Sequence, residues 1–153
     1  MKVAIISDNH GNKRAIDKLF ERNDFDYLFY LGDGISDIGT YLYLDNVYAV
    51  SGNCDFMSSV ENERFFELEG IKFFITHGNR YGVKYSMDSI VDRAKEVGAK
   101  VVCFGHTHRQ LIEERDGILF VNPGSFKRID GMSIGLYLNI EEGKFSFSSL
   151  RIE

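Results

Sequence analysis

The sequence lacks tryptophan and contains only one proline and two cysteines among its 153 residues. Cys54 and Cys103 are far apart in the chain, which excludes a disulfide framework and a thiolate zinc site. Uncharged runs are short, and none is long enough to span a bilayer. The first apolar run meets Asp8 after four residues, so we expect neither a signal peptide nor a membrane anchor, and a cytoplasmic location.

The chain also has no excess of basic residues, since its net charge is −5 at pH 7. This balance argues against general nucleic-acid binding, although bound metal ions could still supply the local positive charge that a phosphate needs. Hydrophobic residues make up 44% of the chain, and the 13 Phe and 8 Tyr predict a packed globular protein rather than disorder. No linker, repeat or low-complexity segment divides the chain, so we expect a single domain over residues 1–153.

The first half of the chain alternates apolar runs with polar loops. Runs over residues 2–7, 27–31 and 47–50 are typical of strands buried on both faces. A helix is expected after the first run, with Asn12 as its N-cap and an apolar stripe within residues 15–20. This alternation predicts an α/β layer arrangement.

The second half is dominated by strand patterns. A helix is expected over residues 86–97, with Gly98 as its C-terminal stop. The turn pairs Asp116-Gly117 and Glu142-Gly143 separate apolar segments. The strands expected in this half cover residues 64–68, 71–76, 101–104, 110–114, 118–121, 134–140 and 145–152.

Side chains able to bind metal follow the ends of the expected strands. They comprise all four histidines of the chain, two aspartates and one asparagine: Asp8, His10, Asp33, Asn53, His77, His106 and His108. Ligands collect beyond the carboxyl ends of strands in open α/β sheets, so we expect these seven groups to converge on one mouth.

Spacing and chemistry support a metal site. In an extended chain, residues i and i+2 point to the same side, so Asp8 with His10, and His106 with His108, should each offer two ligands to one locality. Imidazole, carboxylate and amide donors suit Mn, Fe, Co, Ni or Zn. The alternative for any one residue is an ordinary turn or cap, but the shared placement of all four histidines favours ligation.

Five short motifs in order resemble those of the calcineurin-like metallophosphoesterases. They are Asp8-Asn9-His10, Gly32-Asp33 followed by Asp37, Gly52-Asn53-Cys54-Asp55, His77-Gly78 and Gly105-His106-Thr107-His108. Asn122-Pro123-Gly124-Ser125 is similar to a late segment of the small, uncapped bacterial and archaeal phosphodiesterase branch. The resemblance implies a four-layer α/β sandwich of two packed mixed β-sheets flanked by helices, which agrees with the strand-rich second half.

The resemblance also implies a dinuclear centre that hydrolyses small phosphodiesters. Two divalent ions, manganese first among the options, would activate a hydroxide that attacks phosphorus in line. By resemblance, one ion is held by Asp8, His10 and His108, the other by Asn53, His77 and His106, and both by Asp33. The residues expected to act in catalysis are Asp33, Asn53, Cys54 and Asp55.

Cys54 departs from the pattern, because many members of the family have histidine there. A neutral thiol is a poorer proton donor, which predicts slow turnover of alkyl diesters and better turnover of aryl diesters. Asp37 and Asp55 are expected either to orient ligating imidazoles or to be loop caps. Basic residues near the motifs are candidate phosphate contacts, with Arg128 first, then Arg80, Lys84, Arg109 and Lys127.

Two other functions stay open at this stage. One is a phosphomonoesterase or nucleotide phosphatase, and the other is a protein-binding scaffold similar to a retromer subunit that has this fold with a degraded metal site. All seven ligand positions here keep metal-competent residues, which favours catalysis. Neither a P-loop nor a dinucleotide-binding fingerprint is present. The physiological substrate, the native metal and the oligomeric state, including a homo-oligomer, are left open.

Overall fold

The computed structural model describes residues 1–153 and contains two five-stranded sheets. The first sheet has the order β10-β9-β1-β2-β3 and the second has the order β4-β5-β6-β8-β7. The strands of the first sheet are β1 (Lys2–Ile6), β2 (Tyr27–Tyr30), β3 (Val47–Ala49), β9 (Ser133–Glu141) and β10 (Lys144–Ile152). Those of the second are β4 (Glu63–Leu68), β5 (Ile71–Thr76), β6 (Val101–Phe104), β7 (Gln110–Arg115) and β8 (Ile118–Pro123).

Both sheets are mixed. In the first, β1, β2 and β3 run parallel, while β9 is antiparallel to both β1 and β10. In the second, β5, β6 and β8 run parallel, with β4 and β7 antiparallel at the two edges. The register places Val3 opposite Tyr27 in one sheet and Phe73 opposite Val101 in the other.

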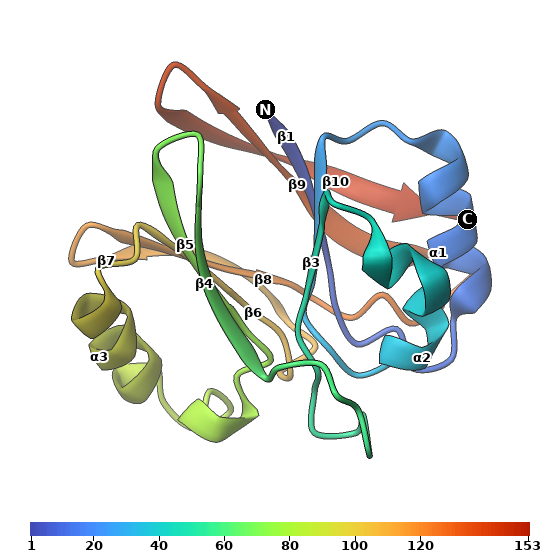
Figure 1. Ribbon diagram of the computed structural model, residues 1–153, viewed down its shortest axis with the longest axis horizontal. Helices are drawn as coiled ribbons and strands as arrows, with labels where there is room; N and C mark the ends of the chain where they lie inside the picture. The colour runs from blue at the N-terminus through green and yellow to red at the C-terminus, as the bar shows by residue number, and fades with distance from the viewer.

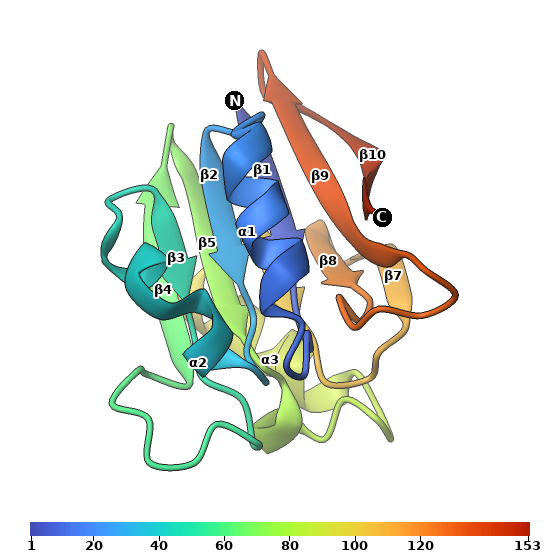
Figure 2. The same ribbon diagram turned by 90° about the vertical axis from the view of Figure 1, so that its right-hand side faces the viewer.

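The two sheets pack face to face, and helices cover their outer faces (Figure 1). Along β1, Val3 and Ile5 point into the core between the sheets, whereas Ala4 and Ile6 point outward, as the two-residue period of a strand requires. The helical elements are α1 (Lys13–Arg22), α2 (Ile35–Ile38), η1 (Gly39–Tyr43), η2 (Asn79–Tyr81) and α3 (Asp88–Val97). Figure 2 shows α1 lying along β1 and β2.

The layers confirm the α/β class and the expected pair of packed mixed sheets with helices. Ile16 and Leu19 of α1 pack against the outer face of the first sheet, and Ile90 and Ala94 of α3 pack against that of the second. No helix in the structure has the length and apolar character needed to cross a membrane.

Local details differ from the expectations. Asn12 precedes α1 but makes no capping hydrogen bond, because its amide donates instead to the carbonyl of Phe126 and the hydroxyl of Ser133. Strand β8 continues to Pro123, beyond the expected end at residue 121. The short helices α2 and η1 were not expected, since 4 and 5 residues are too few to show a helical hydrophobic period.

Phe29 tests the two-sheet core directly. It lies on β2 with no exposed surface, and its ring centroid is 5.3 Å from that of Phe66 and 5.1 Å from that of Phe73, both in the second sheet. Phe29→Ala should therefore lower the free energy of unfolding by about 3–5 kcal/mol in urea titrations of chelator-treated protein. Phe56→Ala is the control, because Phe56 is 84% exposed. Equal stability of the two variants would contradict this packing.

Candidate metal centre

The loops that carry the expected ligands leave the carboxyl ends of β1, β2, β3, β5 and β6. Hydrogen bonds join loops of the two sheets, since the Phe126 N–H donates to the Ser7 carbonyl at 2.7 Å and His77 Nδ1 lies 2.6 Å from the Leu31 carbonyl. Six side chains consequently form two clusters, in each of which one ligand atom per residue lies within 4.8 Å of the others. We call them cluster one, which contains Asp8, His10 and His108, and cluster two, which contains Asp33, His77 and His106.

One carboxylate oxygen of Asp8 faces the imidazoles, and the other accepts hydrogen bonds that hold the side chain in place. Its Oδ2 accepts hydrogen bonds from the Ser7 hydroxyl at 2.6 Å and the His106 N–H at 3.1 Å. Its Oδ1 is buried and has no hydrogen-bond partner. The Nε2 atoms of His108, His77 and His10 lie 3.3, 3.8 and 3.9 Å from this oxygen. A buried carboxylate oxygen without a partner requires an explanation, and a cation among these nitrogens provides one.

Asp33 repeats this arrangement. Its Oδ1 accepts a hydrogen bond from the Cys54 N–H at 2.8 Å, while its Oδ2 lies 3.3 Å from His77 Nε2 and 3.9 Å from His10 Nε2. Asp33 Oδ2 therefore faces one histidine of each cluster. Burial acts to raise the pKa of Asp33, but the hydrogen bonds from His77 and the Cys54 N–H outweigh it, so the pKa lies well below its usual value. The carboxylate is ionised at neutral pH.

The Leu31 carbonyl fixes the tautomer of His77. Because Nδ1 donates to that carbonyl, neutral His77 has its lone pair on Nε2, and the proton that charges His77 sits on Nε2 and faces Asp33 Oδ2. Nε2 also lies 3.3 Å from His106 Nδ1. In cluster one, Nε2 of His10 and Nε2 of His108 are 3.4 Å apart. Such close nitrogen pairs need either a shared proton or a cation that both can ligate.

The two histidines of cluster two differ in their pKa values. Burial lowers the pKa of His77, but the hydrogen bond to Asp33 and the charge of Asp8 raise it above the ordinary value. Burial, followed by the charges of His77 and Lys84, lowers the pKa of His106. A metal ion entering cluster two would thus compete with a proton mainly at His77.

The backbone at the ligands is left-handed. The φ angles of Asp8, His10, Asp33, His106 and His108 are 56°, 42°, 64°, 69° and 62°. Each such non-glycine residue costs roughly 1–3 kcal/mol, and strain of this kind gathers at functional sites. The extended geometry expected for Asp8 with His10 and for His106 with His108 was wrong, because these residues have positive φ angles. Asp8 and His10 share cluster one, whereas His106 and His108 belong to different clusters.

Asp55 and Asp37 accept hydrogen bonds from the loops and none from an imidazole. Of the two roles expected for them, orientation of a ligating imidazole was therefore wrong. The Asp55 carboxylate accepts hydrogen bonds of 2.7–2.9 Å from the N–H groups of Gly52, Asp33, Gly34 and Ile35. Asp37 accepts from the Asn9 amide at 2.7 Å and the Gly11 N–H at 2.9 Å. Both carboxylates therefore hold the ligand loops in shape, as loop caps do.

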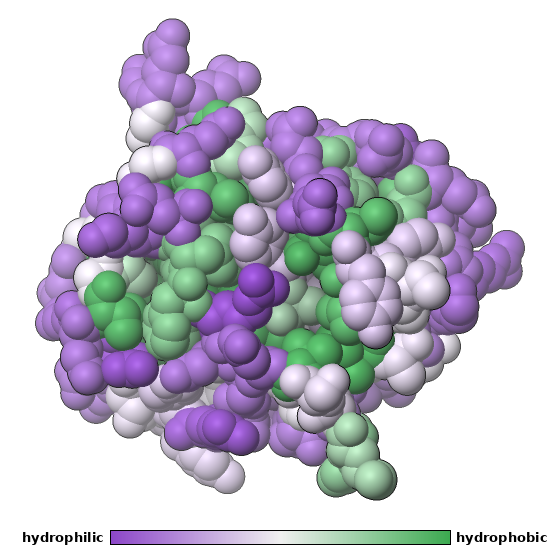
Figure 3. All heavy atoms as spheres, viewed as in Figure 1, coloured by the Kyte–Doolittle hydropathy of each residue, from purple (hydrophilic) through white to green (hydrophobic).

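Asn53 and Cys54 lie at the edge of the site. Both are exposed, and the one hydrogen bond of the Asn53 side chain joins its Nδ2 to Cys54 Sγ at 3.5 Å. The Asn53 side chain forms no hydrogen bond to either cluster, although the N–H of its neighbour Cys54 donates to Asp33 Oδ1. Burial, followed by the charge of Asp33, raises the pKa of the Cys54 thiol, which is neutral at pH 7. Beyond it, Phe56 and Met57 are 84% and 104% exposed, and Figure 3 shows apolar atoms that project at the lower edge of the face it displays.

Two glycines allow the loops to approach so closely. A Cβ at Gly52 would collide with the Asp33 carboxylate, and one at Gly105 would collide with Ser7 and Asp8. Larger residues at these positions would displace the carboxylates from the imidazoles.

The basic residues do not enter the clusters. Arg128 is exposed in the loop after β8 and forms no hydrogen bond or ion pair, so its role as a phosphate contact stays a prediction. Ser7 and Ser125 are the residues that the sequence did not indicate. The Ser125 hydroxyl donates to the Asp8 carbonyl at 2.8 Å, so both serines position Asp8. A single serine next to an aspartate, as at Ser7, does not indicate a site in a sequence. The motif around Ser125 identified its segment but did not indicate that Ser125 positions Asp8.

The donor set fits divalent metal ions. Each cluster combines one carboxylate with two imidazoles, which is chemistry suited to Mn, Fe, Co, Ni or Zn. Asp8 Oδ1 is the clearest evidence for a cation, because it is buried and has no hydrogen-bond partner. The side chains of His10 and His108 are 30% and 46% exposed, so a ligand can reach cluster one from solvent.

Comparison with known proteins agrees with this site. A probable metallophosphoesterase of Bacillus subtilis, YsnB, is 34% identical over 128 residues, covering 83% of this chain and 76% of that protein. Phosphodiesterase MJ0936 of Methanocaldococcus jannaschii is 30% identical over 145 residues, covering 81% and 83%. Vacuolar protein sorting-associated protein 29 of Schizosaccharomyces pombe is 30% identical over 136 residues, covering 82% and 72%.

A solved structure from Streptococcus pneumoniae TIGR4, described as a conserved uncharacterized protein and predicted phosphoesterase, superimposes with a TM-score of 0.86. It is 25% identical, and the match covers 97% of this chain and 88% of that one. A sequence model of the calcineurin-like phosphoesterase superfamily domain matches residues 1–141. Members of this family bind divalent metals, for which the two clusters supply the donors. The chain belongs to the calcineurin-like phosphoesterase superfamily.

Proposed function

We propose that the protein is a phosphodiesterase with a two-metal centre. In this proposal cluster one holds one divalent ion, cluster two with Asn53 holds the other, and Asp33 contacts both. The observation that carries it is the buried, partnerless Asp8 Oδ1 with three imidazole nitrogens within 3.9 Å. Asp33 is suited to the shared position because its Oδ2 faces His10 and His77 at once.

The residues of the chain would divide the work as follows. When bound, a pair of divalent ions supplies Lewis acidity and lowers the pKa of water at the site. Asp8 and Asp33 present one oxygen each and are oriented through the other, so neither must reorganise when it binds. The Leu31 carbonyl orients His77, and Asp55 fixes the loops that carry Asp33 and Asn53. The protein's contribution is thus a rigid set of donors.

Manganese is our first choice of metal, with Ni, Fe, Co or Zn as the other options. Two imidazoles and one carboxylate per cluster give a mixed nitrogen and oxygen environment that suits ions of this group. Thiolate is absent from both clusters, and Cys54 keeps its proton at neutral pH because its pKa is raised.

Phosphodiesters are the substrates we favour. A relative named as a phosphodiesterase, MJ0936, shares 30% identity over most of both chains. His10 and His108 are partly exposed, so a substituted phosphate can reach the clusters without passing through a closed channel. We infer a small substrate rather than a nucleic-acid chain, because the protein carries a net charge of −5.

A protein-binding scaffold is the second candidate function, and the similarity to vacuolar protein sorting-associated protein 29 motivates it. In a scaffold, the clusters would have no need of paired, oriented carboxylates. The intact donor sets of both clusters therefore favour catalysis.

Asp33→Ala should remove both metal binding and diesterase activity, because this side chain faces both clusters. Metal content by mass spectrometry should fall from about two ions per chain to one or none, and hydrolysis of bis(4-nitrophenyl) phosphate should drop by at least about 100-fold. Asp92→Ala is the matched control, since Asp92 is exposed on α3 and forms no ion pair. Full metal content in the Asp33 variant would contradict its shared position.

The preference for diesters is measured by comparing bis(4-nitrophenyl) phosphate with 4-nitrophenyl phosphate at equal metal loading. We expect kcat/KM to be at least about tenfold higher for the diester, because the net charge of −5 repels a dianionic monoester more strongly than a monoanionic diester. A higher value for the monoester would support a phosphomonoesterase. Absence of activity on both, with metal bound, would support the scaffold.

Cys54 predicts a strong dependence on the leaving group. Its neutral thiol is a weak acid beside the site, so alkyl diesters should react far more slowly than aryl diesters. Cys54→His should raise kcat for dialkyl phosphodiesters, which must release an alkoxide, by about 10-fold or more, while kcat for bis(4-nitrophenyl) phosphate changes little. Cys54→Ser serves as the control. An equal effect of both substitutions on the two substrates would exclude proton donation from this position.

A further inference from the structure

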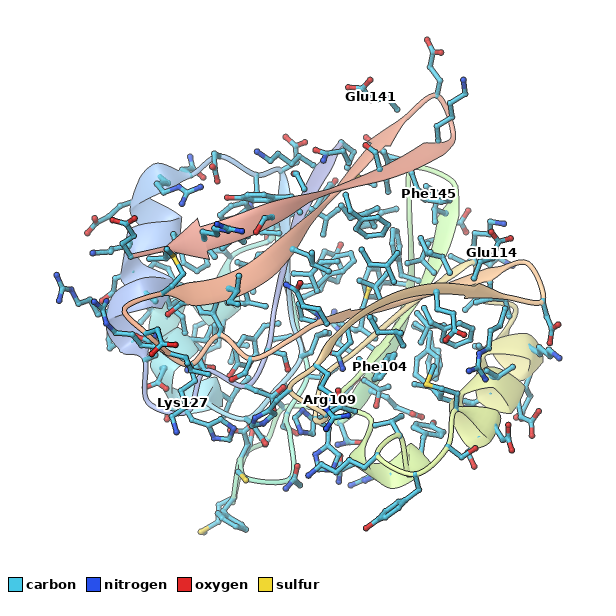
Figure 4. All side chains as sticks on the ribbon, turned by 180° about the vertical axis from the view of Figure 1, so that it is seen from behind. Phe104, Arg109, Glu114, Lys127, Glu141 and Phe145 are labelled. Carbon is cyan, nitrogen blue, oxygen red and sulfur yellow. The ribbon has the colours of Figure 1, made fainter.

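A groove of about 640 Å³ lies between the segment that precedes α3 and strand β7, and it reaches the loop that carries His106 and His108. Its floor is apolar and is formed by Val83, Met87, Phe104 and Leu111. Phe104 ends β6, so it stands two residues before His106. Figure 4 places Phe104 and Arg109 near one another at the end of the second sheet from which the ligand loops leave.

The groove is continuous with the ligand loops. Val83 packs directly on Gly78, the residue after His77, since a Cβ at Gly78 would lie 3.0 Å from Val83 Cγ2. Thr107 stands between His106 and His108 and also lines the groove. The Asn122 amide donates to the Thr107 hydroxyl at 3.0 Å, which fixes this shared wall. A substrate held at the clusters can therefore extend an arm into the groove.

Two cations without partners lie at the rim of the groove. Lys84 and Arg109 are exposed, and neither forms an ion pair. The other charges of the lining cancel, because Arg115 Nε lies 3.1 Å from Glu113 Oε1. Lys84 and Arg109 therefore carry the uncompensated positive charge of the groove, next to its apolar floor.

We propose that this groove binds one ester arm of the substrate, and that it selects an aromatic arm carrying a second anionic group. The ring of such an arm would cover the apolar floor, and Lys84 and Arg109 would contact its anion. This inference rests on the proposed phosphodiesterase function. It assigns Lys84 and Arg109 to substrate specificity, and it favours them over Arg128 for that task.

Two diesters of matched shape test the proposal. One is 4-nitrophenyl 4-sulfophenyl phosphate, and the other carries a neutral methylsulfonyl group in place of the sulfonate. Both release 4-nitrophenolate, so the ratio of their kcat/KM values, divided by the ratio of their rate constants for uncatalysed hydrolysis, reports the charge of the retained arm. We expect the wild-type protein to prefer the sulfonate about threefold to fivefold, since exposed charge pairs contribute modestly, and to lose the preference in high salt.

Substitutions at the rim identify the cations responsible. Lys84→Met and Arg109→Gln should each reduce the preference by about half, and the double variant should bring the ratio to about one. Lys144→Met is the matched control, because this substitution also removes one positive charge. Lys144 begins β10, which starts at the opposite end of the molecule from the groove (Figure 1). A preference that is absent in the wild type, or lost equally in the Lys144 variant, would overturn the proposal.

Binding of the arm alone separates this inference from the proposed function. Phenol-4-sulfonate, titrated into metal-free protein, should shift the methyl NMR signals of Val83, Met87 and Leu111, and Lys84→Met should weaken this binding about threefold. Shifts confined to other methyl groups would overturn the groove assignment. Diesterase activity with no charge preference would overturn this inference alone, whereas metal-loaded protein without diesterase activity would overturn the proposed function and this inference with it.

Discussion

Two buried carboxylates, each anchored through one oxygen and free at the other, are the constraint on which the site depends. Asp8 is held by Ser7 and the His106 N–H, and Asp33 is held by the Cys54 N–H. The free oxygens face imidazoles at 3.3–3.9 Å. Burying a carboxylate oxygen without a partner is costly, so the fold stabilises this arrangement elsewhere, through the core between the two sheets.

The site in turn explains local features of the fold. Left-handed backbone at five ligand residues turns the loops sharply after their strands, and glycines at positions 52 and 105 let neighbouring loops approach. Asp55 ties the loop after β3 to the loop after β2 through four backbone N–H groups. Rigid loops of this kind hold the two carboxylates and the imidazole nitrogens close together, despite their mutual repulsion, until a cation binds between them.

The sequence was sufficient for the strands, the two helices α1 and α3, and the gathering of six ligand residues, because apolar runs and their polar ends mark parallel strands clearly. Residue spacing was not sufficient for the partition of the ligands, which only the family resemblance implied. His106 and His108 separate because their backbone is left-handed, which residue spacing does not reveal. The sequence left Asp55 with two possible roles, orienting an imidazole or capping a loop, and its backbone N–H partners, which have no sequence signature, decide for the second. Tertiary contacts also determined the hydrogen bonding of Asn12, whose amide donates to the Phe126 carbonyl and does not cap α1.

The central claim is that the two clusters each hold a metal ion. Anomalous diffraction from crystals of manganese-loaded protein, recorded at the manganese absorption edge, measures this most directly. The account predicts two anomalous peaks, one among Asp8, His10 and His108 and the other among Asp33, His77 and His106. No peak at either cluster, or peaks only at other surface carboxylates, would contradict it.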